Sequence, residues 1–367
     1  MRGSFGEHYK LTIFGESHGP AIGMVVDGLP AGMPIDEEAI ARDMARRAPG
    51  NDPTATARKE ADRVRIVSGV FEGRATGTPL CGIIENTNTR SGDYAQLRAL
   101  MRPGHADYAG HVRYGGFNDP RGGGHFSGRL TAPLVFAGSL ARAFLAQRGI
   151  HIGAHIAAIA GIEDARFDPV RVDAGTLAAL RESRFPLLDP SLETPMREAV
   201  QAAREAQDSV GGVIECAAVG VPAGIGSPFF GSVESVVGSL AYAVPAVKAV
   251  EFGDGMGIAG LRGSQANDPM RMRDGRVTLL SNHNGGVTGG ITDGMPVILR
   301  VAIKPTPSIA SEQQTVDVLA GEDATLSVRG RHDPCIVPRA VVVIESVLAI
   351  GLTELILGQT STPPDRP

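Results

Sequence analysis

The sequence contains no tryptophan, and it has only 5 tyrosines and 12 phenylalanines in 367 residues. Its three cysteines, Cys81, Cys216 and Cys335, are too few for a disulfide framework and have no metal-binding spacing. The first eight residues lack the apolar core of a signal peptide. We therefore expect a cytoplasmic protein without structural disulfides and without a metal site.

Neither sign of charge dominates, because 35 Lys and Arg stand against 40 Asp and Glu, for a net charge of -5. This balance argues against a broad nucleic-acid-binding surface but allows a local anion site. The longest apolar stretch, residues 340–358, carries Glu345 and Glu354, and two carboxylates disfavour a membrane span. We expect neither a nucleic-acid partner nor a membrane partner.

Apolar periodicity and terminal residues predict the main helices, at 36–47, 130–149, 194–208, 232–244 and 337–357. Runs rich in β-branched residues predict the strands, at 11–14, 23–27, 64–70, 80–84, 212–221 and 295–303.

A regular strand–helix–strand alternation is absent, which argues against a doubly wound sheet. Glycine turns between short strands favour antiparallel pairing, so the predicted class is α+β with buried helices. We expect one domain over residues 1–367, with a surface excursion at 163–193 and a flexible tail at 358–367.

Glycine is in excess, since 48 of 367 residues is about 13%, against ~7% in average proteins. Many glycines lie in short clusters with His, Arg, Ser and Asp. Such clusters let backbone N–H groups approach a ligand, while the side chains supply acid and charge. Histidine is also tolerated in ordinary polar loops, but several of these loops meeting at one site is the better interpretation. Five of the nine histidines lie in them, namely His18, His105, His125, His283 and His332.

The segment 121–129, RGGGHFSGR, precedes an apolar helix, so its N–H groups would form an anion site at a helix N-terminus. Arg121 and Arg129 would then bind phosphate. The alternative is a glycine-rich turn with solvated arginines. No Gly-Lys-Ser/Thr follows, and the glycines are contiguous, so neither a P-loop nor a dinucleotide fingerprint is indicated.

Ser17 and His18 follow an apolar strand. Because neighbours on an extended chain point to opposite faces, we expect no serine–base pair here. His18 is better interpreted as a general acid or a phosphate contact, with a turn histidine as the alternative. In the segment 102–107, Asp107 either orients His105 or caps the following turn.

Twelve motifs together resemble the chorismate synthase family, over essentially the whole chain to about Leu357. In order they are GESHG at 15–19, RRAPG at 46–50, FEG at 71–73, IEN at 84–86, RPGHAD at 102–107, RGGGHFSGR at 121–129, GVPAGIG at 220–226, VKAVEFGDG at 247–255, RGSQAND at 262–268, SNHNGG at 281–286, KPTPS at 304–308 and GRHDPC at 330–335.

The resemblance implies conversion of 5-enolpyruvylshikimate 3-phosphate to chorismate by a 1,4-elimination of phosphate that requires reduced FMN. It also implies a β-α-β sandwich, with helices between two antiparallel sheets, and a homotetramer. Whether the chain reduces its own flavin with NADPH stays open. Because no Rossmann fingerprint is present, we favour supply by an external flavin reductase.

The resemblance also implies site residues. His18 and His105 match histidines with acid roles, and Asp333 matches a carboxylate near the flavin. Arg47 matches a position assigned to NADP, and the substrate-binding charges would be Arg102, Arg121 and Arg129. Positions matching FMN contacts are His125, Phe126, Ser127, Ala246, Gly289, Lys304, Pro305, Thr306, Pro307, Ser308 and Arg331.

This chain departs from the family pattern at four of the aligned positions. Other members have Arg and Ser where it has His125 and Phe126, Glu where it has Leu130, and Arg where it has Pro53. Two other function classes fit the same residue types, a metal-free phosphatase and a flavin- or nucleotide-binding module without turnover.

Overall fold

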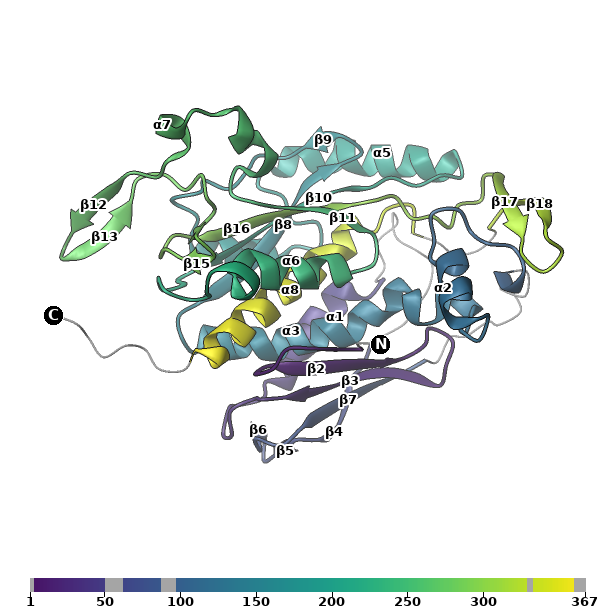
Figure 1. The fold of residues 1–367 in the computed structure, drawn as a ribbon, viewed down its shortest axis with the longest axis horizontal. Coiled ribbons are helices and arrows are strands. Elements are labelled where there is room, and N and C mark those ends of the chain that lie inside the picture. The colour runs from purple at the N-terminus through teal and green to yellow at the C-terminus, as the bar shows by residue number, and fades with distance from the viewer. Residues whose placement is uncertain (1–2, 50–61, 87–96, 329–332, 360–367) are drawn as a thin grey trace.

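The computed structural model describes residues 3–49, 62–86, 97–328 and 333–359, and Figure 1 shows how their helices and strands are arranged. The N-terminal half supplies a five-stranded sheet in the order β1-β2-β3-β7-β4. All of its neighbouring strands are antiparallel. Its strands are β1 (Ser4–Phe5), β2 (Lys10–Gly15), β3 (Ala21–Asp27), β4 (Arg65–Ser68) and β7 (Leu80–Glu85).

A second five-stranded antiparallel sheet has the order β11-β16-β10-β8-β9. Its strands are β8 (His151–Ile159), β9 (Ile162–Glu163), β10 (Gly212–Val219), β11 (Val247–Phe252) and β16 (Val297–Ile303). The prediction of antiparallel pairing is thus confirmed. The strand predicted at 64–70 is divided into β4 and β5 (Val70–Phe71), because β4 pairs with β7 whereas β5 pairs with a different strand, β6 (Arg74–Ala75).

Long helices lie between the two sheets in Figure 1. The helix α3 contacts β2, β3 and β7 of the first sheet, whereas α8 contacts β8 and β10 of the second. All five predicted helices are confirmed to within three residues. They are α1 (Glu37–Arg47), α3 (Thr131–Ala146), α5 (Glu193–Glu205), α6 (Val233–Ala243) and α8 (Val337–Gly358).

The sequence pattern does not predict the shorter helices α2 (Asp107–Tyr114), α4 (Ala174–Glu182) and α7 (Gly263–Ala266). The remaining strands form small hairpins, which are β5 with β6 (Arg74–Ala75), β12 (Met270–Arg273) with β13 (Arg276–Leu279), β14 (Val287–Thr288) with β15 (Ile291–Thr292), and β17 (Gln313–Asp317) with β18 (Glu322–Leu326).

The helix α8 is long and apolar enough to cross a membrane by length and composition alone. However, 78% of its most apolar window is buried inside the protein, where it packs on α3, α6 and the second sheet. A helix that contacts protein on all sides needs apolar residues all round. Its composition therefore follows from its place in the core.

The segment 163–193, predicted as a surface excursion, packs α4 against β8 on the second sheet. Phe167, Leu177 and Leu180 of this segment are buried against Ala217 and Ile298 of the sheet. The segment therefore adds an outer layer with its own small apolar core. The predicted tail at 358–367 lies outside the described residues from 360 onward.

A row of paired charges crosses the same face of the second sheet. His155, Glu215, Arg300 and Glu251 are neighbours in register on β8, β10, β16 and β11. Nε2 of His155 lies 3.0 Å from Glu215, and its Nδ1 lies 3.0 Å from Asp164 in the outer layer. Burial by itself lowers the pKa of His155, but the two carboxylates raise this pKa by more than burial lowers it, so the net shift is upward. The imidazolium therefore ties the outer layer to the sheet.

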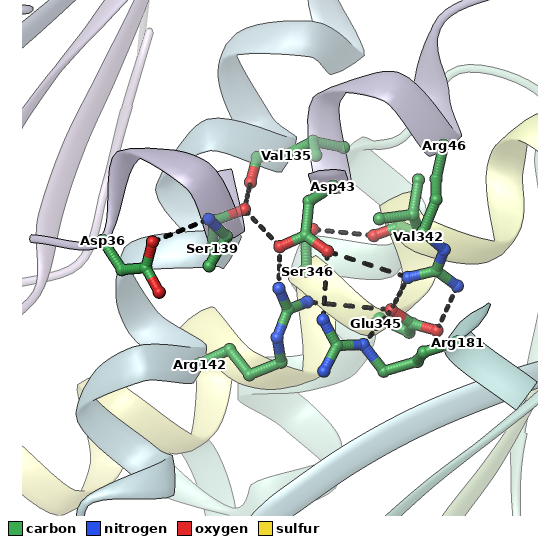
Figure 2. A network of polar contacts seen from close by, with 11 residues as sticks. Asp36, Asp43, Arg46, Val135, Ser139, Arg142, Arg181, Val342, Glu345 and Ser346 are labelled. Atoms are coloured by element: carbon green, nitrogen blue, oxygen red, sulfur yellow. Dashed lines mark hydrogen bonds and ion pairs between the residues drawn. The ribbon is translucent and has the colours of Figure 1, made fainter. Parts of the chain in front are cut away.

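A second ionic cluster is buried among the helices, as Figure 2 shows. The carboxylates of Asp43 on α1 and Glu345 on α8 are fully buried. The two terminal guanidinium nitrogens of Arg46, Nη1 and Nη2, donate to Glu345 at 2.6 and 2.7 Å. Arg142 and Arg181 bond to Asp43, and burial together with the charge of Arg181 lowers the pKa of Arg142 to about 10. The cluster ties α1, α3, α4 and α8 together.

Candidate active site

Three consecutive glycines lie against the two histidines singled out in the sequence. Gly122, Gly123 and Gly124 have left-handed backbone, with φ of 59°, 85° and 52°. A Cβ on Gly122 would lie 2.3 Å from the ring of His18, and one on Gly123 would lie 2.9 Å from the ring of His105. Glycine is therefore required both by the backbone angles and by these contacts. The loops 15–19, 102–107 and 121–129 meet at this place.

His105 is held by two charged neighbours. Its Nδ1 lies 2.5 Å from Oδ1 of Asp107, and Arg102 bonds to both oxygens of that carboxylate, at 2.7 and 2.8 Å. An ionised carboxylate only accepts hydrogen bonds, so the proton of this contact lies on Nδ1. The Nε2 atom then faces the glycine loop, 3.0 Å from where a Cβ on Gly123 would stand. Of the two roles considered for Asp107, it orients His105.

The Asp107 carboxyl stays ionised at neutral pH. Burial by itself raises its pKa, but hydrogen bonds and charge from Arg102 and His105 lower it by more, so the net shift is well below the ordinary range. The carboxylate therefore carries a full negative charge beside the imidazole.

His18 lies in a turn after β2 and is only 5% exposed. Its Nδ1 is 3.2 Å from Oγ of Ser17. The expectation that these neighbours point apart is wrong, because residues 17 and 18 form a turn rather than an extended strand. The backbone N–H of Ser17 donates to Gly124 at 3.1 Å, and Asn86 donates to the carbonyl of Glu16 at 3.0 Å. The glycine loop and Asn86 thus fix the position of His18.

A buried carboxylate joins two arginines beside this loop. Nη1 of Arg47 lies 2.6 Å from Oδ2 of Asp62, and Arg129 bonds to the other oxygen. Burial alone raises the pKa of Asp62, but the charges of Arg47 and Arg129 lower it overall. One buried carboxylate thus holds two guanidinium groups beside the glycine loop. No pattern in the sequence points to Asp62, which follows a segment outside the described residues.

Arg47 also supports the start of α3. Its Nη2 donates to the carbonyl of Gly128 at 3.0 Å, and its Nε donates to Oγ1 of Thr131 at 3.2 Å. With 4% of its surface exposed, it is an interior residue. Arg129 is equally buried, and its Nε donates to Oδ1 of Asn86 at 3.2 Å.

The segment 304–308 packs against the turn that carries His105. Nζ of Lys304 donates to the carbonyl of Gly104, and Arg102 donates to Oγ of Ser308 at 3.1 Å. Partial burial and the nearby charge of Lys248 lower the pKa of Lys304. The backbone N–H of Lys304 bonds to Ala246 at 2.9 Å. Ala246 and Lys304–Ser308 are thus brought together with this turn.

Asp333 contacts the segment 304–308 directly and is linked to Arg47 through Arg339. Its carbonyl accepts a hydrogen bond from Thr306 at 2.8 Å, and its carboxylate pairs with Arg339. Arg339 also donates to the carbonyl of Arg47 at 3.0 Å. Arg331, predicted beside it, lies outside the described residues.

Comparison with known proteins gives one family over almost the whole chain. Residues 9–357 match the family model of chorismate synthase. Curated relatives with that name include those of Korarchaeum cryptofilum, 44% identical over 96% of this chain and 97% of the relative, and of Archaeoglobus fulgidus, 46% identical over 98% of both. A solved structure described as "Crystal Structure of Chorismate Synthase" is 27% identical, with a TM-score of 0.74 over 96% of this chain and 93% of that one.

The chain belongs to the chorismate synthase family. The resemblance noted in the sequence is therefore confirmed. Chorismate synthases are carbon–oxygen lyases of the shikimate pathway of aromatic amino acid biosynthesis, and they eliminate phosphate from 5-enolpyruvylshikimate 3-phosphate. They require reduced FMN.

The residues of this chain fit an anionic cofactor and an anionic substrate. His18, His105, Gly122 and Gly123 form what we call the cradle. Because a Cβ on either glycine would clash with an imidazole, main-chain groups lie directly beside both rings. Lys304 and Arg102, at the same turn, supply positive charge for phosphate or carboxylate. Within the described parts of the chain, no group of three His, Cys, Asp or Glu side chains could hold a metal ion.

Not every predicted contact residue lies at the cradle. Gly289 connects β14 to β15, and in Figure 1 this hairpin lies at the end of the molecule opposite α2. Arg121 is half exposed and pairs with Asp119 at 2.7 Å. Gly289 is thus kept apart from the cradle, and Arg121, like Arg47, Arg102 and Arg129, is paired with a carboxylate.

The three residues after the glycines have mainly structural contacts. Nδ1 of His125 lies 2.8 Å from the carbonyl of Gly15. Phe126 packs near Tyr114 of α2, with 6.1 Å between ring centroids. Ser127 accepts a hydrogen bond from the backbone N–H of Arg129 at 3.3 Å. These contacts hold the glycine loop between β2 and α2.

Proposed function

We propose that the cradle formed by His18, His105, Gly122 and Gly123 is the place where this chain eliminates phosphate from 5-enolpyruvylshikimate 3-phosphate. The observation that carries the proposal is the close approach of the two glycines to the two imidazoles. A ligand lying along this loop would contact both general-acid candidates at once.

Reduced FMN, when bound, supplies electron density that weakens the bond between carbon and the departing phosphate. The protein supplies position and charge. His18 would donate a proton to the leaving phosphate, and Asp107 orients His105 so that its Nε2, which faces the glycine loop, would be available to the flavin. Arg102 and Lys304 attract the anionic groups.

We also propose the finer features of the family for this chain. Helices between two sheets support a β-α-β sandwich in a single domain. We propose a cytoplasmic homotetramer. Arg47 lies at the position matched to NADP. Its buried guanidinium already donates hydrogen bonds to Asp62, Gly128 and Thr131. That occupancy favours flavin reduced by an external flavin reductase over direct reduction by NADPH.

An anaerobic assay tests the proposal. The purified chain is mixed with 5-enolpyruvylshikimate 3-phosphate, with and without reduced FMN, and both chorismate and phosphate are measured. We expect chorismate only with reduced FMN. Phosphate release without flavin would instead select the phosphatase, and ligand binding without turnover would select the binding module.

The cradle itself is tested by Gly122→Ala, with Gly73→Ala as the matched control. Both glycines have positive φ, 59° and 71°, but a Cβ on Gly73 meets no atom within 4 Å. Backbone strain is therefore comparable, whereas only the first variant crowds His18. Gly122→Ala should lose most of its activity and Gly73→Ala should keep it; equal losses would refute the cradle.

A further inference from the structure

The side chain of Asn86 lies between the turn that carries His18 and the arginine beside the glycine loop, Arg129. Asn86 directly follows β7, which pairs with β3 in the first sheet. Its backbone N–H donates to the carbonyl of Pro20 at 3.1 Å. The sheet therefore fixes the backbone of Asn86 independently of the contacts that its side chain makes.

The amide group of Asn86 bonds in two directions. Its Nδ2 donates to the carbonyl of Glu16 at 3.0 Å and to the carbonyl of Gly19 at 2.9 Å. Its Oδ1 accepts a hydrogen bond from Nε of Arg129 at 3.2 Å. A reversed amide would place its oxygen against two carbonyls and its NH2 group against a guanidinium, so this orientation is fixed. Among side chains of this length, only asparagine supplies two donors and an acceptor.

The two carbonyls that Asn86 holds stand on either side of His18. Glu16 begins the turn and Gly19 ends it, and the backbone N–H of Gly19 donates to the carbonyl of Glu16 at 3.0 Å. One amide thus holds both ends of this turn. The buried ring of His18 lies against Gly122 on the other side. The imidazole can therefore move only together with a turn that Asn86 keeps in place.

The guanidinium group of Arg129 is held from two sides. Its Nη1 pairs with Asp62, whose other carboxylate oxygen pairs with Arg47. Its Nε donates to Asn86. Asn86 is therefore a direct link between a buried arginine and the turn that carries the proposed proton donor.

We propose that Asn86 is a positioning residue, which fixes His18 relative to Arg129 so that both reach the same departing phosphate. This inference rests on the proposed function, in which His18 is the proton donor. A proton donor must lie within about 2.6–3.2 Å of the atom that it protonates. A misplacement of about 1 Å can lower the rate about 100-fold. Asn86 acts on the reaction only through the place that it gives His18.

Two variants separate the two sides of the amide. Asn86→Asp keeps the shape and an acceptor for Arg129 but cannot donate to the turn, whereas Asn86→Ala loses the contacts on both sides. Because both variants lose the donated hydrogen bonds, each should lower kcat at least about tenfold. Chorismate formation is measured anaerobically at saturating substrate and reduced FMN, so that changes in affinity do not enter.

The matched control is Asp164→Asn in the outer layer. Asp164 is also a buried side chain that holds a loop, because it accepts hydrogen bonds from the backbone N–H groups of Leu188 and Asp189. The swap of carboxylate for amide disturbs these contacts without touching the cradle, so the control should keep its kcat. Thermal unfolding verifies that each variant is folded. If Asn86→Ala does not fold, Asn86→Asp replaces it in the measurements that follow.

A double-mutant cycle distinguishes positioning of His18 from a general structural role. In His18→Ala the proton donor is already missing, so adding Asn86→Ala should change kcat by less than about twofold. A general structural role predicts the same loss in both backgrounds. Equal losses, or an unchanged kcat in either Asn86 variant, would overturn the positioning role alone. Full activity of His18→Ala would instead refute the assignment of His18 in the proposed function, and the positioning role with it.

Chemical modification provides a readout that needs neither flavin nor turnover. Diethyl pyrocarbonate acylates accessible imidazoles, and mass spectrometry of the digested protein measures each histidine separately. His18 should react several-fold faster in Asn86→Ala than in the unmodified chain, because its turn is released. His105, which Asp107 holds, should react equally in both. Equal acceleration of the two histidines would indicate general loosening, and an unchanged rate at His18 would mean that Asn86 does not hold the turn; either result would overturn the proposal.

Discussion

Oδ1 of Asp107 lies 2.5 Å from Nδ1 of His105, and this contact fixes which ring nitrogen is available to a ligand. The carboxylate is itself held by Arg102 through two hydrogen bonds. The imidazole is thus oriented by a charged group that is already rigid. Removing the charge without changing the shape should therefore affect catalysis more than folding.

For Asp107→Asn we expect kcat to fall by about 100-fold, the lower range for a general acid, with little change in KM. An amide at position 107 can donate as well as accept, so the proton is no longer held on Nδ1 of His105. Steady-state kinetics measures kcat and KM. Asp119→Asn, which alters an exposed pair with Arg121, is the control. An unchanged kcat would reduce Asp107 to a structural residue.

The two histidines should differ in what their loss changes. A proton donor to the leaving phosphate acts mainly in the transition state, so His18→Ala should lower turnover by ~100- to 10,000-fold with little change in substrate affinity. His105→Ala should instead alter the spectrum of bound reduced FMN. Anaerobic turnover and flavin spectra are measured for both variants with substrate bound. The opposite pattern would reverse the assignment, and losses below about threefold in both would leave them as loop residues.

Asp62 should be decisive for stability. Asp62→Ala leaves Arg47 and Arg129 buried beside each other, and breaking a buried pair in this way costs about 3–5 kcal/mol. Urea unfolding at pH 7 measures the loss. Glu193→Gln, which removes a surface pair with Arg197 on α5, should change the free energy of unfolding by less than ~1 kcal/mol. Similar losses for the two variants would contradict the role of Asp62 as the shared partner of two buried arginines.

The same residues separate binding from folding. Arg129→Ala still leaves Asp62 paired with Arg47, so it should destabilise the fold less than Asp62→Ala. It also removes a positive charge beside the glycine loop, which should weaken binding of the phosphorylated substrate by roughly 2–4 kcal/mol. Anaerobic calorimetry measures the affinity. Unchanged affinity per folded molecule would make Arg129 purely structural.

His155 should make the outer layer sensitive to alkaline pH. Its pKa is raised in the folded state, so its contribution to stability is fully present below the unfolded value of ~6.5 and is lost as pH rises through the folded value. The backbone N–H groups of Phe167 and Leu188, which bond to the carboxylates flanking His155, report the change. Their hydrogen-exchange protection should fall above about pH 6.5, corrected for intrinsic exchange. The trend should disappear in His155→Gln, whereas its persistence there would exclude His155 as the cause.

The sequence by itself determined the long elements and the family. The five long helices have strong apolar periodicity and clear ends, for example Asp36, whose side chain accepts the hydrogen bond from the N–H of Ala39. The strand β8 gave no such signal, because it is buried on both faces and loses the alternation that identifies a half-exposed strand. Short elements such as α2 have too few turns for a periodic pattern.

The site divides in the same way. Glycine clusters with His and Arg indicated an anion site, since only a few residue types combine close backbone approach with charge. Only the tertiary structure decided which loops meet, that Ser17 and His18 lie in a turn, and that Asp62 joins Arg47 to Arg129. Asp62 and Arg129, for example, are 67 positions apart in the sequence. Local spacing carries no information about such contacts. Packing of the two sheets and their helices brings these side chains together, and burial then sets their charges.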